Sequence, residues 1–152
     1  MTSRSGSQLE GTNQMATTTV LSNPALLIDA VDYSDQCTSA VLTLTKESLE
    51  STTFADTART YTAGLTNVEV TCTLMLAYGS SEVEENLEAN VLGQNVDVVI
   101  YATSSTTASA TNPQYTITGA YCESISPISG ALGELQTIDI TLSGGSYTRA
   151  VA

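Results

Sequence analysis

The sequence predicts an all-β domain of the sandwich or barrel type with one flanking α-helix. Apolar and polar side chains alternate with a period of two in most segments after residue 25, which is typical of strands that bury one face. Charged residues make up only 13% of the 152 residues, against a usual share of roughly 25%. Ser and Thr supply the polar surface instead, and β-branched Thr favours strands because it packs well on a half-exposed pleated face.

The predicted strands follow one another in order along the chain. Leu26–Ile28 and Val31–Tyr33 flank the pair Asp29-Ala30, which indicates a small hairpin, and a turn follows at Ser34–Asp35. The remaining strands are predicted, in order, at Ser39–Thr45, Val68–Ala77, Val96–Tyr101, Tyr115–Ile125 and Leu135–Leu142.

The clearest strand is Val68–Ala77. Every second side chain from Val68 to Leu76 is apolar, which predicts a core-facing side. The strand Leu135–Leu142 alternates in the same way, with Ile138, Ile140 and Leu142 predicted in the core. The intervening polar residues then face outward, and a slip of one residue would invert the two faces.

One helix is predicted at Ser81–Leu92. Ser81 and Glu84 have the spacing of a capping box, and Val83, Leu87 and Val91 share one face at intervals of four residues. Gly93 supplies the stop signal.

Two segments are predicted as loops, and one segment is predicted to lie outside the domain. Glu47–Leu65 is long and polar, and Ser104–Pro113 is rich in Ser, Thr and Ala. Connections longer than about 12–15 residues are usually functional or disordered. Residues 1–15 are polar and rich in Gly and Ser, which predicts a disordered N-terminal extension or an expression remnant. Residues 16–152 form the predicted domain.

Charge and composition exclude several function classes. The chain has 16 acidic residues, 4 basic residues and no His, for a net charge of −12. Without His there is no Ser-His-Asp or Cys-His arrangement, and no phosphate-binding glycine motif occurs. We therefore expect no enzyme activity and no cofactor. The acidic surface repels nucleic acid at contact range, and no apolar stretch approaches the length of a membrane span.

Three smaller features have a structural and a functional interpretation. Cys37, Cys72 and Cys122 are predicted to be buried free thiols, because no CxxC pair or His completes a metal site. Asp29, Asp32 and Asp35 recur at every third residue; we favour turn-forming carboxylates over a cation-binding loop. Arg59 is one of few cations, and either an ion pair with Asp56 or a contact with a neighbouring subunit is expected.

Several stretches together resemble the major tail (tail tube) proteins of siphophage-type bacteriophages. The resemblance covers nearly all of residues 16–152 and rests on the order and spacing of short pieces. These pieces are Val20–Asn23 running into Ile28–Asp35; Phe54–Arg59 with Gly64–Leu65; Ala110–Pro113 through Tyr115, Thr118–Gly119 and Glu123–Ser124; and Gly130–Leu135.

The resemblance implies a structural virion protein. Family members form hexameric rings through long β-hairpins that close an inter-subunit β-barrel, and the rings stack into a hollow tube. The implied partners are further copies of the chain, a tape-measure protein, and terminator and tip proteins. DNA passes through the lumen without specific binding. The implied location is the phage tail, assembled in the host cytoplasm.

The resemblance and the alternation together predict two sets of functional residues. Thr and acidic side chains on the outward-facing sides of strands would line the lumen, since such walls repel phosphates. This set is Glu69, Thr71, Thr73, Asp97, Glu123 and Asp139. The long loop would contact neighbouring rings or subunits through Phe54, Asp56, Arg59, Tyr61 and Leu65.

Two other classes compete with the tail tube. One is another virion protein of similar β-architecture, such as a capsid decoration protein or a tail terminator protein. The other is a cell-surface β-sandwich module that binds carbohydrate or another ligand; such a module is expected to have an aromatic-lined concave site, and the chain has no Trp and one Phe.

Overall fold

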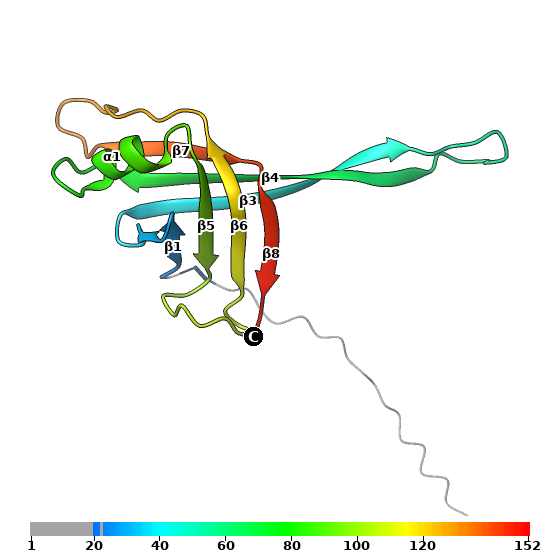
Figure 1. The fold of residues 1–152 in the computed structure, drawn as a ribbon, viewed down its shortest axis with the longest axis horizontal. Coiled ribbons are helices and arrows are strands. Elements are labelled where there is room, and N and C mark those ends of the chain that lie inside the picture. Colours follow the sequence, from blue (N-terminus) through cyan, green and yellow to red (C-terminus); the bar gives the residue numbers. More distant parts are fainter. Residues whose placement is uncertain (1–19, 22) are drawn as a thin grey trace, which may run out of the picture.

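The computed structural model describes residues 20–21 and 23–152, which form one antiparallel β-structure with a short helix (Figure 1). The predicted N-terminal extension, residues 1–15, lies outside the described residues. The strands are β1 (Ala25–Ile28), β2 (Val31–Asp32), β3 (Cys37–Glu50), β4 (Tyr61–Met75), β5 (Asn95–Tyr101), β6 (Gln114–Cys122), β7 (Thr137–Ser143) and β8 (Ser146–Ala150). This architecture confirms the predicted fold class.

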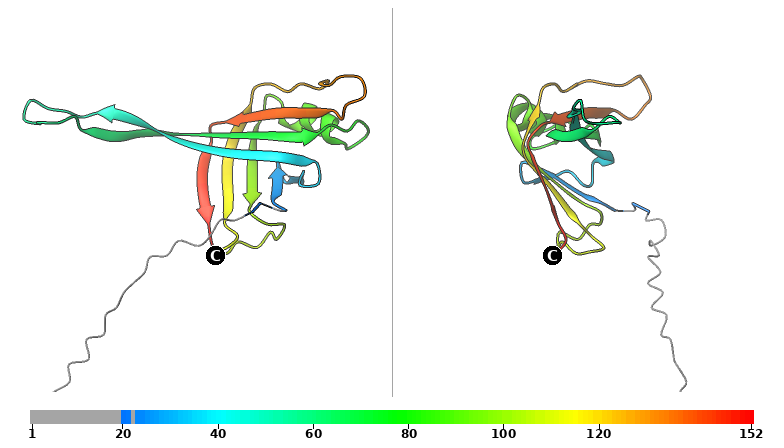
Figure 2. Two further views of the ribbon diagram at one scale, coloured as in Figure 1. Left: turned by 180° about the vertical axis from the view of Figure 1, so that it is seen from behind. Right: turned by 90° about the vertical axis from the view of Figure 1, so that its right-hand side faces the viewer.

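The strands are hydrogen-bonded in the order β2-β1-β5-β6-β7-β4-β3, and β8 pairs with β6 beside this path. The sheet bends sharply where β6 meets β7, because these strands share only the pairs Tyr121–Ser143 and Cys122–Leu142. As a result β5, β6 and β8 cross β3, β4 and β7 at a steep angle, which is visible in Figures 1 and 2.

The core lies between these two halves of the sheet. The alternate residues Val68, Val70, Cys72 and Leu74 are all buried, as are Ile138, Ile140 and Leu142. Both predicted core faces are therefore confirmed, except that Leu76 follows the end of β4 and is only partly buried. The opposite half contributes Val96, Val98, Ile117, Ala120 and Cys122, and the helix adds Val83, Leu87 and Val91.

The hairpin of β1 and β2 forms as predicted. Asp29 and Ala30 form its two-residue turn, with φ of 51° and 63°, as a type I′ turn requires. Asp32 shapes the next turn, where its carboxylate accepts hydrogen bonds from the backbone N–H and the hydroxyl of Ser34. For Asp32, this bonding agrees with the prediction that Asp29, Asp32 and Asp35 are turn-forming residues.

The predicted loop Glu47–Leu65 is wrong in its extent. β3 continues to Glu50 and β4 begins at Tyr61, so only residues 51–60 connect them. The two strands form a hairpin that projects far beyond the body of the subunit (Figure 2). Most side chains on both faces of its distal half are exposed. The amphipathic pattern that reveals a strand is therefore absent from this segment.

The predicted helix is also corrected in detail. An α-helical turn, α1 (Val83–Asn86), passes directly into a π-helical turn, η1 (Leu87–Val91). Glu82 rather than Ser81 is the N-cap, without a side-chain capping bond. Ser81 instead has a φ of 67°, and its N–H donates to Oε2 of Glu85 at 2.5 Å. The buried face of Val83, Leu87 and Val91 is as predicted.

Sequence analysis missed β8. The turn at Gly144–Gly145, with φ of 81° and 88°, returns the chain along β6, where Tyr147 pairs with Ile117 and Arg149 with Tyr115.

Asn112 holds the loop before β6: its Oδ1 accepts a hydrogen bond from the Thr103 N–H at 2.9 Å, and its Nδ2 donates to the Ser105 and Thr107 carbonyls.

Candidate functional site

The outward side of β3, β4 and β7 is a largely polar surface that also includes the exposed apolar residue Val41, and we call it the polar face. The strand register aligns its side chains in cross-strand rows, because opposed residues of antiparallel strands share a face. The rows are Ser39–Thr73–Asp139, Val41–Thr71–Thr141 and Thr43–Glu69–Ser143. These rows contain two carboxylates and no Lys or Arg, so the polar face carries negative charge.

One hydrogen bond organises this face across strands. The hydroxyl of Thr73 donates to Oδ1 of Asp139 at 2.5 Å, which orients the carboxylate and leaves its second oxygen free to meet solvent. Glu69 is exposed in a neighbouring row. The face therefore presents fixed hydroxyls and carboxylates, both of which act as hydrogen-bond acceptors.

Four of the six residues predicted to face a lumen share the polar face, and two do not. Glu69, Thr71, Thr73 and Asp139 lie in its rows. Asp97 lies on β5 at a register shift, where its Oδ1 accepts the Gly119 N–H at 3.0 Å. Glu123 is exposed just beyond the end of β6.

The polar face is bounded by an unpaired strand edge. β3 is the last strand of the sheet and pairs only with β4 among the described residues. Its outer edge therefore offers backbone N–H and C=O groups to another strand. At the other side of the face, β7 pairs with β6 through Leu142 and Ser143 only, so most of this edge of β7 is likewise without a ladder partner in the described part of the chain.

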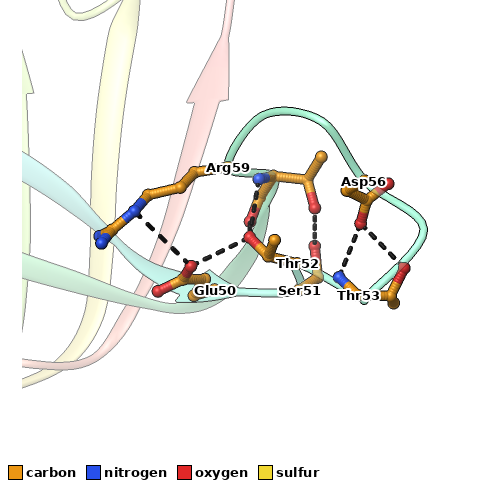
Figure 3. Close-up of polar contacts among 7 residues, drawn as sticks. Glu50, Ser51, Thr52, Thr53, Asp56 and Arg59 are labelled. Atoms are coloured by element: carbon orange, nitrogen blue, oxygen red, sulfur yellow. Dashed lines mark hydrogen bonds and ion pairs between the residues drawn. The ribbon is translucent and has the colours of Figure 1, made fainter.

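The connection between β3 and β4, residues 51–60, forms a compact tip (Figure 3). Oδ2 of Asp56 accepts hydrogen bonds from the backbone N–H and hydroxyl of Thr53 at 2.7 and 3.0 Å. The hydroxyl of Thr52 accepts the N–H of Thr60 at 3.0 Å. These bonds fix the backbone while the Phe54 side chain remains fully exposed.

The predicted ion pair between Arg59 and Asp56 is wrong. Asp56 is engaged with Thr53, and Nε of Arg59 lies 4.0 Å from Oε1 of Glu50 (Figure 3). The side chains of Arg59 and Glu50 are 75% and 48% exposed. At this exposure and distance an ion pair contributes little to folding, so most of the guanidinium remains accessible to a partner.

The five predicted contact residues all lie on the projecting hairpin. Phe54, Asp56 and Arg59 lie in the tip, and Tyr61 and Leu65 lie on β4. Phe54, Tyr61 and Leu65 are exposed apolar or amphipathic side chains. These five residues are exposed and contribute nothing to the core.

Sequence analysis missed a second exposed apolar group. Ile128, Leu132 and Leu135 lie in the connection between β6 and β7, residues 123–136, which we call the end loop. Figure 1 places the end loop and the hairpin tip at opposite ends of the long axis. The available sequence signal was the recurrence of large apolar residues among Ser and Gly between residues 125 and 135.

A cavity of about 470 Å³ opens where the hairpin leaves the body. Lys46 lies at this site together with apolar side chains from β3, β4 and β8. The lining residues are Leu44, Lys46, Thr66, Val68, Gly145, Ser146 and Tyr147. Tyr147 is also stacked on Tyr115, with ring centroids 6.4 Å apart.

The three thiols are not activated. Burial raises the pKa of the Cys72 thiol to about 12, and burial also raises the pKa values of Cys37 and Cys122. Raised pKa values suppress the thiolate that acts as nucleophile or metal ligand. Cys72 and Cys122 are buried and Cys37 is partly buried, all three as free thiols.

Among residues 20–21 and 23–152, no three His, Cys, Asp or Glu side chains are grouped so that they could hold a metal ion. Within the same part of the chain, no helix combines the length and apolar character that crossing a bilayer requires.

Comparison with known proteins gives structural matches only. No family model and no curated protein matches the sequence. A chain in the cryo-EM structure of the anti-feeding prophage tube-terminating cap superposes with a TM-score of 0.67 at 16% identity, covering 95% of this chain and 100% of its own.

Two further matches come from an extracellular contractile injection system in its extended state. A chain of the PVC sheath/tube terminator has a TM-score of 0.68 at 12% identity, covering 91% of this chain and 100% of its own. A chain of the PVC sheath-tube complex has a TM-score of 0.63 at 13% identity, covering 99% and 100%. At these identities the similarity shows a shared fold, so the chain has the tail-tube-like fold of such tube, terminator and cap assemblies.

Proposed function

We propose that this chain is a structural subunit of a phage-type tail tube, which assembles into stacked hexameric rings. The observation that supports this most directly is the combination of an acidic, Thr-rich face with a free β3 edge on the same sheet. The structural neighbours belong to tube, terminator and cap assemblies, which supports the same class of particle.

In this proposal the polar face lines the lumen. Duplex DNA carries one negative charge per roughly 1.7 Å of its axis, so a wall with Glu69 and Asp139 and no cation in its rows repels it. Thr side chains are polar without charge and do not hold phosphate as Lys or Arg do. The duplex would therefore slide instead of binding.

The free edges close the ring. β3 of one subunit adds its backbone groups to the sheet of its neighbour, which removes the exposed edge. Six subunits would enclose the lumen, and the projecting hairpin would reach the next ring. The partners are further copies of the chain, a tape-measure protein inside the growing tube, and terminator and tip proteins at its ends. The location is the virion tail, after assembly in the host cytoplasm.

A non-enzymatic role is part of the same proposal. The thiols have raised pKa values, and the chain contains no His. The acids of the polar face are exposed and show no partner other than Thr73, which suits a surface better than a reaction centre.

A tube terminator is the second candidate, because two of the structural matches belong to a tube-terminating cap and a sheath/tube terminator. The two roles differ in whether rings stack on one another. Negative-stain electron microscopy of the purified protein over a range of concentration and salt separates them. Hollow filaments support the tube subunit, whereas single six-fold rings that never stack favour the terminator. A strictly monomeric or trimeric species at every concentration and salt tested, with an end fragment of a tail tube added as initiator, would contradict both.

A further inference from the structure

Two exposed apolar surfaces lie at opposite ends of this subunit. The hairpin tip and the end loop lie at opposite ends (Figures 1 and 2). Phe54 in the tip and Leu132 and Leu135 in the end loop are fully or largely exposed. Ile128, Leu132 and Leu135 group three exposed apolar side chains in one loop, and a group of exposed apolar side chains is a feature of contact sites. Their placement matters, because surfaces at opposite ends cannot meet within one subunit.

The end loop is held in place rather than loose. Tyr78 anchors both of its sides, since its hydroxyl lies 2.9 Å from the Pro127 carbonyl oxygen and 3.0 Å from Oε1 of Gln136. The Leu76 N–H donates to the Gln136 carbonyl at 3.0 Å. The loop therefore presents its Leu side chains outward on a fixed frame, which limits the entropy lost when a partner binds.

The charges at the two ends are complementary. Arg59 lies in the tip, with its ion pair to Glu50 at 4.0 Å and its side chain 75% exposed. Between residues 126 and 136 of the end loop the single charged residue is Glu134, which is exposed between Leu132 and Leu135. The tip thus offers one exposed cation, Arg59, beside Asp56, whose carboxylate is already bonded to Thr53, and the end loop offers Glu134 between its two Leu side chains.

We propose that the hairpin tip of one subunit binds the end loop of a second copy in the adjacent ring. Phe54 packs against Leu132 and Leu135, and Arg59 pairs with Glu134. The two surfaces are different, so the contact is heterologous and repeats without closing. It stacks rings along the axis, whereas β3 edge pairing closes them. The inference rests on the proposed function and adds to it the surface that receives the hairpin.

Cysteine cross-linking tests the contact directly. Phe54→Cys and Leu132→Cys are introduced into separate chains, both with Cys37→Ser because Cys37 is only partly buried. The chains are mixed and treated with a short bismaleimide. The matched control replaces Leu132→Cys by Thr106→Cys, an exposed position in the loop between β5 and β6. We expect a cross-linked dimer for 54–132 under tube-forming conditions and none for 54–106.

A charge exchange provides a second, independent test. Arg59→Glu and Glu134→Arg each place like charges opposite one another, and each is expected to raise the critical concentration for tube formation roughly three- to tenfold. The double variant restores the opposite charges and is expected to recover most of that loss. Because both side chains are exposed, neither change is expected to alter folding.

The outcomes separate this inference from the proposed function. A 54–132 cross-link in tubes, with recovery by the double charge variant, supports the contact. Tubes that form without the cross-link overturn the contact and leave the tube proposal in place. A cross-link that persists in isolated rings would place the contact within a ring and overturn the stacking assignment. If the unmodified chain forms no tube with or without an initiator, both proposals fail.

Discussion

The substitution Phe54→Ala is expected to weaken assembly of the chain without changing the stability of its fold. The Phe54 side chain is fully exposed in the subunit. The hydrogen bonds that shape the tip are made by Thr52, Thr53, Asp56 and Thr60. Exposed substitutions without such contacts usually change stability by no more than about 0.5 kcal/mol. We therefore expect the free energy of unfolding of the monomer to stay within that range.

The magnitude of the assembly effect follows from the same exposure. Burying a Phe side chain completely contributes about 1.5–3 kcal/mol, and the entire side chain is available for burial at an interface. Its loss is expected to raise the critical concentration for tube formation about 10- to 150-fold. The lower end applies if Phe54 is only partly covered in the tube.

Two measurements check this expectation. Sedimentation over a dilution series gives the critical concentration, and urea denaturation of the unassembled subunit gives the free energy of unfolding. Leu21→Ala is the matched control, because Leu21 is an exposed apolar residue outside the hairpin, the polar face and the end loop. The control is expected to assemble like the unmodified chain.

An unchanged critical concentration for Phe54→Ala would refute the reasoning, because it would mean that the tip stays exposed in the tube. A fall in unfolding free energy beyond about 1 kcal/mol would refute it differently, since the side chain would then contribute to folding. An equal loss of assembly in Leu21→Ala would show that any exposed apolar residue matters, and the tip would have no special role.

Three further predictions concern the lumen, the core and the thiols. Glu69→Lys with Asp139→Lys changes the net charge of a hexameric ring by about +24. Tubes of this variant are expected to retain a labelled short duplex at low salt and release it as salt rises. Equal retention by a control with Asp35→Lys and Glu88→Lys would contradict the lumen assignment. Ile140→Ala removes a fully buried side chain and is expected to lower the unfolding free energy by about 2–5 kcal/mol in urea denaturation; a loss under about 1 kcal/mol would contradict its core role. Burial raises the pKa of the Cys72 thiol to about 12 in the folded chain, so the unfolded chain loses this proton at lower pH. Above pH 9 the free energy of unfolding is therefore expected to fall with pH by about 1.4 kcal/mol per pH unit more than in Cys72→Ala. Identical dependence of the unfolding free energy on pH in the two chains would contradict the burial of the thiol.

Sequence patterns predicted those strands that bury one face. In Val68–Leu74 and Ile138–Leu142 the alternation is regular because one side meets the core and the other meets solvent. The distal half of the hairpin gave no such pattern, since most of its side chains are exposed on both faces. The polar composition of this segment predicts a loop, although cross-strand pairing continues to Glu50 and Tyr61.

The remaining differences have equally local causes. β8 is short, and its residues are only partly buried, so its alternation is weak. The capping prediction failed because Ser81 adopts a left-handed backbone conformation, which a spacing rule does not detect. Four of the predicted lumen residues lie on one face because they occupy alternate, outward-facing positions of the paired strands β4 and β7. Asp97 and Glu123 lie elsewhere, because the alternation of side chains along a strand does not specify which half of a bent sheet the strand joins.

The positions of the cations argue for assembly through the hairpin and the strand edges. A subunit of net charge −12 repels its own copies, so each contact between copies benefits from a local positive charge. Among residues 20–21 and 23–152 there are three cations. Lys46 lies on the free edge strand β3, Arg59 lies in the tip, and Arg149 lies on β8, which pairs only with β6 among the described strands. All three lie on elements that project or present an open edge, and none lies in the rows of the polar face. Positive charge is therefore concentrated where copies would meet and absent where DNA would pass.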